Sequence, residues 1–197
     1  MKIRVFSDIH NDLRALYNNA KAEADLYFAA GDLVSWARGL PACGEVLRPL
    51  GKKLFVIPGN HESAEDIASF CDEFGFENFH EGVLERDGIH FAGLGYSNPT
   101  PFNTPGEYSE DELAARLARF EGLNPLVLVC HTPPRETALD KTSGGIHCGS
   151  ASVRSFIDAQ QPSWFFCGHI HEAAGIEIRM GKTRARNVGP KGFSFEI

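Results

Sequence analysis

The chain of 197 residues is 43% hydrophobic and carries a formal net charge of -7, which is typical of a globular protein and excludes a disordered or fibrous one. The length predicts a single domain over residues 1–197. The acidic balance provides no basic footprint of the kind that binds nucleic-acid polymers, so such a partner is not favoured.

The five cysteines show no paired spacing, and Cys130 and Cys167 lie inside apolar runs. Free thiols of this kind are typical of a reducing compartment. The first expected strand begins at Lys2, which leaves no room for a signal peptide, and no apolar run is long enough to cross a membrane. We therefore expect a cytoplasmic protein with no membrane partner.

Strands and helices alternate in the first part of the chain. We expect strands over 2–6, 25–30 and 53–57, helices over 11–24 and 64–74, and over 33–51 a less regular helix and loop that Pro41 and Pro49 interrupt. Ser63 is expected to cap the helix over 64–74, with Asp66 at its third position. Such alternation predicts a largely parallel sheet flanked by helices, in which ligands bind beyond the carboxyl ends of the strands.

The pattern changes after Gly75. Asp87-Gly88 predicts a hairpin of strands 83–85 and 89–94, and Ser109 with Glu112 forms a capping box before another helix. Further on we expect strands over 126–130 and 164–167, a helix over 150–159, and an antiparallel meander over 175–179, 182–187 and 192–197. The intervening loops, 95–107 and 135–149, have no periodicity, so their conformation and role cannot be read from the sequence.

Side chains of metal-ligand type follow five of the apolar runs. Alternate residues of a strand share a face, so Asp8 and His10 should point the same way. The candidate ligands are Asp8, His10, Asp32, Asn60, His131, His169 and His171. This set is too large for one tetrahedral zinc and fits two five- or six-coordinate divalent ions that share a bridging carboxylate. Nitrogen and oxygen ligands accept Mn, Fe, Zn, Co or Ni, of which we favour Mn.

Charge balance indicates what such a site would bind. Two divalent cations beside the carboxylates of Asp8 and Asp32 leave a net positive charge, which attracts a phosphate group. A local cationic centre in an acidic protein predicts a small phosphorylated substrate.

These motifs, Asp8-x-His10, Gly31-Asp32, Gly59-Asn60-His61, His131 and Gly168-His169-x-His171 in this order, resemble the calcineurin-like metallophosphoesterase superfamily, and in particular its small phosphodiesterase-like branch. The resemblance implies a four-layer α/β/β/α sandwich of two mixed β-sheets flanked by helices. It also implies roles. One ion is held by Asp8, His10, Asp32 and His171, and the other by Asp32, Asn60, His131 and His169. His61 is a non-ligand catalytic histidine beside the bridging, catalytic Asp32.

The function that this implies is a dimetal-dependent phosphoester hydrolase, a phosphodiesterase or phosphatase, in which a metal-bridging hydroxide attacks phosphorus and His61 assists the leaving group. Glu62 stands where many members that are not protein phosphatases carry Asp. Gly-Asn-His-Glu occurs in serine/threonine protein phosphatases, but the arginine-bearing element of those enzymes is absent after Asp32, so a protein phosphatase is not favoured. The alternative is a non-catalytic protein-interaction scaffold on the same fold. Substrate identity and oligomeric state are not readable.

Four residues are candidates for substrate binding: Asn60, His61, His147 and Arg14. His147 lies in a glycine-rich stretch of the loop 135–149, where a plain surface histidine is the equal alternative. Arg14 lies about one helical turn after His10, where a solvated helix face is the favoured alternative.

Overall fold

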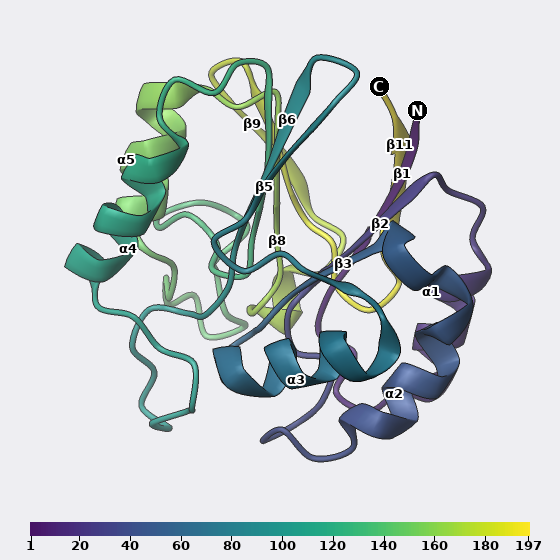
Figure 1. Ribbon diagram of the computed structural model, residues 1–197. Coiled ribbons are helices and arrows are strands. Elements are labelled where there is room, and N and C mark those ends of the chain that lie inside the picture. Colours follow the sequence, from purple (N-terminus) through teal and green to yellow (C-terminus); the bar gives the residue numbers. More distant parts are fainter.

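Two β-sheets pack face to face between two layers of helices in the computed structural model, which describes residues 1–197 (Figure 1). The helices α1, α2 and α3 cover the outer face of one sheet, and α4 and α5 cover the outer face of the other. The two termini lie side by side, where the Ile197 amide donates a hydrogen bond to the Met1 carbonyl (3.0 Å). The chain thus has the four-layer sandwich of two mixed sheets that the family resemblance implied.

The first sheet has the strand order β11-β1-β2-β3-β4. Its strands are β1 (Lys2–Phe6), β2 (Leu26–Ala30), β3 (Leu54–Ile57), β4 (Glu77–Asn78) and β11 (Phe193–Glu196). All neighbours pair in parallel except β11, which is antiparallel to β1. The helices of this half are α1 (Leu13–Lys21), α2 (Leu40–Leu47), the 3-10 helix η1 (Arg48–Lys53) and α3 (Ala64–Phe74).

The second sheet has the strand order β5-β6-β7-β8-β10-β9. Its strands are β5 (Val83–Arg86), β6 (Ile89–Leu94), β7 (Leu126–Cys130), β8 (Trp164–Cys167), β9 (Glu177–Met180) and β10 (Thr183–Asn187). The inner pairs are parallel and both edge strands are antiparallel. The helices are α4 (Glu110–Leu117), α5 (Ala151–Gln160) and the 3-10 helices η2 (Ala118–Phe120) and η3 (His171–Ala173).

Aromatic side chains fill the space between the sheets. Phe28 of β2 and Phe91 of β6 stack there with ring centroids 5.4 Å apart. Because helices cover the outer faces, strands such as β2, β3, β7 and β8 are buried on both sides. This burial explains why these strands read as continuous apolar runs rather than as alternating ones.

The local signals at helix ends are confirmed. The Asp66 amide donates to Ser63 Oγ (3.1 Å) and the Ser63 amide donates back to Asp66 (3.0 Å), which forms a reciprocal capping box. Ser109 and Glu112 form the same box before α4, and the hairpin at Asp87-Gly88 joins β5 to β6.

Two expectations about helices need correction. The first helix begins at Leu13, not at residue 11, because His10 and Asn11 adopt positive φ values of 44° and 69° that no α-helix can contain. Asp12 caps this helix instead, accepting from the Arg14 and Ala15 amides. The prolines at 41 and 49 stand in the first turns of α2 and η1, where the missing N–H costs nothing, so they begin these helices rather than interrupt them.

The predicted C-terminal meander is correct for β9 and β10 and wrong for β11. β10 inserts beside β8 in parallel, and β11 crosses to the first sheet and pairs with β1. Burial decides this placement, because Phe195 then faces Trp164 and Phe166 of the opposite sheet, with ring centroids 4.9 Å apart in both pairs. The sequence analysis also missed the two-residue strand β4.

No helix in this structure combines the length and the apolar character that crossing a membrane requires.

Candidate metal centre

The candidate ligands follow β1, β2, β3, β7 and β8 at one edge of the sandwich, all on loops except His171, which begins η3. Several of these residues have backbone conformations that L-residues rarely adopt: φ is 55° at Asp8, 44° at His10, 53° at Asp32 and 69° at His169. Each such residue costs about 1 kcal/mol or more. Strain at four candidate ligands indicates that the loops are shaped to aim side chains rather than to maximise stability.

Asp8, His10 and His171 form one group of donor atoms. His10 Nε2 and His171 Nε2 lie 3.0 Å apart, and Asp8 Oδ1 lies 3.7 Å from His171 Nε2. The other carboxylate oxygen, Asp8 Oδ2, is buried and has no hydrogen-bond partner in the chain. A buried carboxylate oxygen without a partner costs free energy, unless a cation satisfies it.

Asn60, His131 and His169 form a second group. Asn60 Oδ1 lies 3.2 Å from His131 Nε2 and 2.9 Å from His169 Nδ1. The Asn60 amide nitrogen donates to Thr104 Oγ1 (3.2 Å), which fixes the carbonyl oxygen toward the histidines.

Asp32 lies between the two groups. Its Oδ2 atom is 3.6 Å from His10 Nε2 of the first group and 3.4 Å from His131 Nε2 of the second. The other oxygen, Oδ1, accepts a hydrogen bond from the His61 amide (3.0 Å). One carboxylate oxygen therefore faces both groups of donors, which is the position that a bridging ligand needs.

Hydrogen bonds orient the histidine rings. His131 Nδ1 lies 2.8 Å from the Ala30 carbonyl, which can only accept, so Nδ1 carries a proton and Nε2 faces the second group. Burial lowers the pKa of His131, but the Asp32 carboxylate beside the ring outweighs it and raises the pKa to about 9, so a metal ion would bind Nε2 in exchange for a proton. His10 Nδ1 lies 3.1 Å from Ser35 Oγ, which leaves its Nε2 facing the first group. Second partners of this kind are characteristic of histidines that bind metals.

Divalent cations fit these residues. Within each of two overlapping trios of candidate ligands, Asp8–His10–His171 and Asp8–Asp32–His131, the donor atoms lie within 4.8 Å of one another. A shared cation would satisfy the unpaired Asp8 Oδ2 atom and would stabilise the close approach of the His10 and His171 Nε2 atoms, which lie 3.0 Å apart.

Burial and neighbouring charges set the protonation of the centre. Burial lowers the pKa of His10 to about 4 and that of His169 to about 3, so both rings are neutral, the form that coordinates metal. Burial alone would raise the pKa of Asp32, but His131 and His10 beside it hold it below the usual range. Burial raises the pKa of Asp8, so its carboxylate depends most on a nearby positive charge.

His61 is held differently from the candidate ligands. The Trp36 amide donates to His61 Nδ1 (3.3 Å), so the proton of the neutral ring lies on Nε2. The ring packs edge-on to His10, with centroids 5.1 Å apart, and lines the cavity beside the centre. In this tautomer His61 can donate a proton from Nε2 to a bound group but has no lone pair there for a metal.

Glu62 organises the centre, a role that the sequence analysis missed. The side chain is fully buried, and its oxygens accept from the amides of Asp32 (3.1 Å), Val34 (3.0 Å) and Gly59 (2.8 Å). Burial, together with the Asp32 charge, raises the pKa of Glu62 to about 8, although the amides of Val34 and Gly59 act in the opposite direction. Glu62 thereby ties the loop after β2 to the loop after β3. The signal in the sequence was its place next to His61.

Glycines permit the close approach of these loops. A Cβ atom at Gly59 would collide with the Asp32 carboxylate, and one at Gly168 would collide with Ser7 Oγ. Any larger residue at either position would displace a candidate ligand loop.

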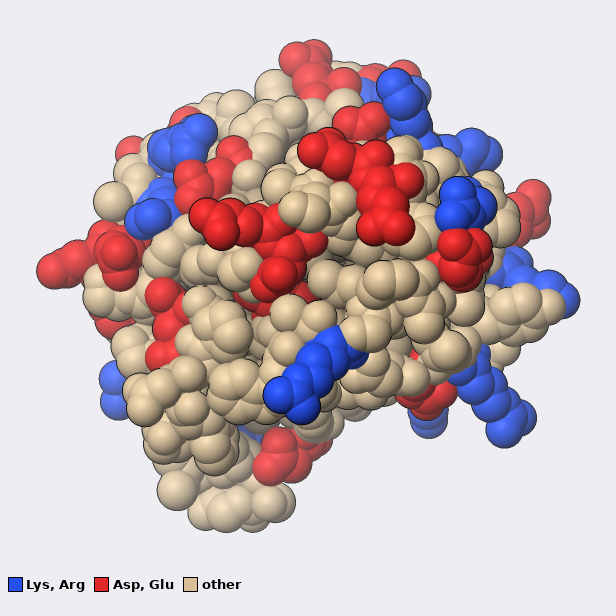
Figure 2. Space-filling model, turned by 60° about the horizontal axis from the view of Figure 1, so that its bottom comes forward, with Lys and Arg blue, Asp and Glu red and all other residues tan.

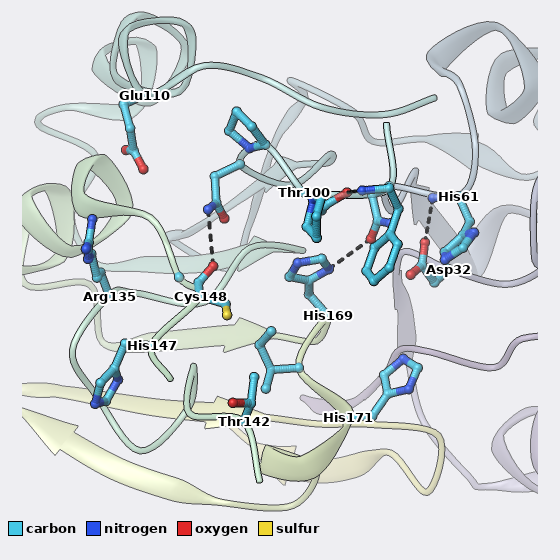
Figure 3. Close-up of a pocket in the computed structure, with 17 residues that line it drawn as sticks. Asp32, His61, Thr100, Glu110, Arg135, Thr142, His147, Cys148, His169 and His171 are labelled. Carbon is cyan, nitrogen blue, oxygen red and sulfur yellow. Dashed lines mark hydrogen bonds between the residues drawn. The ribbon is translucent and has the colours of Figure 1, made fainter. Parts of the chain in front are cut away.

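A cavity of about 600 Å³ opens from the centre. Figure 3 shows Asp32, His61 and His171 at one end of it and Glu110, Arg135 and His147 at the other. The loops 95–107 and 135–149 supply the residues between the ends, among them Asn98, Thr100, Thr142 and Cys148. Of the four predicted substrate contacts, Asn60, His61 and His147 line this cavity, whereas Arg14 is exposed on α1 and does not.

The comparison with protein families identifies the class. The chain belongs to the calcineurin-like phosphoesterase family, whose match covers residues 1–173. That range contains every candidate ligand and the loops that carry them.

Individual relatives are consistent with this family. The chain is 34% identical over 203 aligned residues to the uncharacterized protein MJ1162 of Methanocaldococcus jannaschii, covering 98% of this chain and 90% of that protein. It is 24% identical to the probable glycerophosphodiester phosphodiesterase GpdQ of Arcobacter nitrofigilis, over 85% of this chain but only 65% of that protein. The crystal structure of TT1561 of Thermus thermophilus has the same fold, with a TM-score of 0.72 at 18% identity over 96% of this chain and 90% of that one.

Proposed function

We propose that the protein is a dimetal-dependent phosphodiesterase that acts on a small phosphorylated substrate, with phosphatase activity as the nearest variant. The position of Asp32 Oδ2, 3.6 Å from His10 Nε2 and 3.4 Å from His131 Nε2, is the observation that carries this proposal. A single carboxylate oxygen that faces two sets of donors is suited to two ions and not to one. The relative named a probable glycerophosphodiester phosphodiesterase favours a diester.

Each side chain has a part in the proposed reaction. Asp8, His10, Asp32 and His171 would hold one ion, and Asp32, Asn60, His131 and His169 the other. Two divalent ions supply Lewis acidity to the phosphoryl oxygens and lower the pKa of the attacking water. His61, protonated on Nε2, donates to the leaving oxygen, and the Trp36 amide holds the ring in that tautomer. Asn60, with His61 beside it, would contact the phosphoryl group at the end of the cavity that holds Asp32.

The scaffold alternative requires that catalysis has been lost. The chain carries all seven candidate ligands and His61, and the strained backbone at Asp8, His10, Asp32 and His169 supports a retained catalytic role. A scaffold would have no reason to maintain that strain. Mn is the first metal to test, and a cytoplasmic location remains part of the proposal.

Hydrolysis of bis(4-nitrophenyl) phosphate tests the proposed function. Protein stripped with EDTA should be inactive and should regain activity with Mn²⁺. The Asp32→Asn variant removes the bridging charge but keeps the shape, so it should lose at least about 100-fold in kcat/KM at saturating Mn²⁺. Lys141→Gln, a change in an exposed side chain outside the cavity lining, is the control and should retain activity. Unchanged turnover in Asp32→Asn, or turnover by the stripped protein, would refute the proposal.

A further inference from the structure

The cavity is larger than the phosphoryl group requires. Its volume is about 600 Å³. A phosphate has five heavy atoms and occupies roughly the volume of five waters, about 150 Å³. Most of the cavity is therefore left for the rest of the substrate, and its lining indicates what that part carries.

Arg135 is the one lysine or arginine among the residues that line the cavity. Its backbone is fixed, because its amide donates to the Ser150 carbonyl (3.0 Å) and its carbonyl accepts from Arg154 (3.4 Å). Its guanidinium group, by contrast, has no hydrogen bond or ion pair within the chain. Figure 3 places this side chain at the end of the cavity opposite Asp32 and His61.

The loop 135–149 lines one side of the cavity and is held in place by its own hydrogen bonds. Asp140 is fully buried and accepts from the amides of Glu136 (3.1 Å), Thr137 (2.9 Å) and Gly149 (3.0 Å). It also binds His147 Nδ1 at 2.7 Å. This one carboxylate closes the loop on itself, so the residues beside Arg135 are held before any ligand arrives.

Asn98 connects the loop 135–149 to the loop 95–107 and offers a free acceptor. Its amide nitrogen donates to the Cys148 carbonyl (3.1 Å), while its Oδ1 atom is buried without a partner. An unsatisfied buried oxygen that belongs to a cavity-lining residue points to a ligand with a hydrogen-bond donor.

Glu110 is the carboxylate that lines the same end of the cavity, and its hydrogen bonds are committed elsewhere. It accepts from Ser150 Oγ (2.7 Å) and from the amides of Ala151 (3.2 Å) and Ser152 (2.8 Å) at the start of α5. The positive end of that helix offsets its charge. Glu110 therefore leaves Arg135 without an internal counter-ion.

We propose that Arg135 binds a second anionic group, a carboxylate or a phosphate, carried by the alcohol side of the substrate whose phosphoryl group lies at the metal centre. This inference rests on the proposed function and narrows its substrate class to phosphoesters with an anionic leaving alcohol. A planar guanidinium group with free donors forms paired hydrogen bonds with either anion.

Phosphonates test the subsite without hydrolysis, because their carbon–phosphorus bond has no ester to cleave. We would measure Kd by calorimetry on the Mn²⁺-loaded protein for ω-carboxyalkylphosphonates of increasing chain length and for the matching carboxamides. At the length that spans the cavity, the acid should bind about tenfold tighter than the amide. An α,ω-bisphosphonate of that length distinguishes a carboxylate from a phosphate as the second anionic group. Whichever of the carboxyalkylphosphonate and the bisphosphonate has the lower Kd carries the anion that Arg135 prefers.

Two variants locate the effect. Arg135→Gln should bring the ratio of amide to acid Kd to about one, whereas Lys141→Gln, which removes an equal charge from the same loop outside the cavity lining, should leave the preference intact. Equal Kd values for acid and amide in the natural chain at every length, or an unchanged preference in Arg135→Gln, would overturn the inference. If the protein prefers the acid but does not hydrolyse aryl esters, the Arg135 subsite stands and the proposed hydrolase activity is refuted. If it hydrolyses aryl esters but does not prefer the acid, the hydrolase activity stands and the subsite is refuted.

Discussion

The single hydrogen bond from the Trp36 amide to His61 Nδ1 (3.3 Å) sets the chemistry of this histidine. In the neutral ring it places the proton on Nε2, beside the donor atoms of the candidate metal centre, which supports the proposed role of His61 as a proton donor rather than a ligand. Trp36 also packs edge-on against the ring, with centroids 5.5 Å apart, which limits rotation of the side chain.

Leaving-group dependence tests this role. His61→Asn should reduce kcat by about 100-fold or more on an alkyl phosphoester, whose leaving alcohol needs a proton, and by much less on a 4-nitrophenyl ester, whose leaving group needs none. Metal content per chain, measured by plasma emission spectroscopy, should stay at the natural value. An equal loss on both esters, or a loss of bound metal, would show that His61 acts as a ligand or only as support.

Sequence reasoning found the candidate ligands because each follows a recognisable strand, and parallel strands end at a common edge. Asn98 and Arg135 lacked such a signal, and for Glu62 the only one was its place next to His61. The role of Glu62 depends on three amides from two loops that meet only in the folded chain. Asn98 and Arg135 lie in loops without periodicity, where the fold alone decides which side chains reach the cavity.

At the scale of elements, the Glu62 side chain connects the loops that follow β2 and β3, where the backbone pairing of these two strands has ended. Glu62→Gln keeps the shape but turns one acceptor into an amide donor that faces backbone N–H groups. We expect the free energy of unfolding to fall by about 2 kcal/mol in urea titrations and the affinity for Mn²⁺ to fall about tenfold, because Asp32 loses its support.

A matched exposed variant controls for the exchange of a carboxyl group for an amide. Glu45 pairs with Arg48 on the surface of α2, and Glu45→Gln should leave both stability and metal affinity unchanged within error. If Glu62→Gln behaved like Glu45→Gln, the three amide bonds would not support the centre.

Elements were predictable where a few adjacent residues decide them. Ser63 and Ser109 cap their helices because the capping partner is three residues away. The first helix was predicted too long, because the left-handed backbone at His10 and Asn11 is imposed by contacts with the loop after β2: the amides of these two residues donate to the Asp32 and Leu33 carbonyls (both 3.1 Å).

At the scale of the whole molecule, the placement of β11 shows the limit of local patterns. The alternation of Phe193 and Phe195 indicates a strand with one buried face, but both sheets offer an edge to it. The choice is made by a partner strand at the opposite end of the chain and by the aromatic interior that the strand completes.

The surface carries the acidic balance of the sequence without a basic tract. Figure 2 shows acidic side chains over the face that lies at the bottom of Figure 1, with Lys and Arg side chains scattered among them rather than joined in one patch. This face has no basic patch that would attract a polyanion from a distance. The positive charge proposed for the metal centre and for Arg135 therefore acts only at short range, within the cavity.

Stability of the whole fold should depend on pH through His80. Its Nδ1 accepts from the Gly95 amide (3.1 Å) and its Nε2 lies 3.2 Å from the Tyr108 hydroxyl, so the buried ring is held neutral. Burial lowers the pKa of His80 to about 4; Glu81 beside it acts in the opposite direction, and Arg116 adds to the decrease. The ring also packs against Tyr96, at a centroid distance of 5.2 Å.

The direction of this pH dependence is set by the difference in proton binding at His80 between the folded and the unfolded chain. Between pH 6.5, the ordinary histidine value, and pH 4, the unfolded chain binds a proton at His80 and the folded chain does not, so stability is complete above this window and decreases as the pH falls through it. The decrease reaches roughly 2 to 3 kcal/mol at pH 4.5. Urea unfolding at pH 7 and pH 4.5 should therefore show a smaller loss of stability for His80→Gln than for the natural chain, by about this amount. Parallel losses in the two proteins would mean that the folded chain accepts the proton on His80 as readily as the unfolded one.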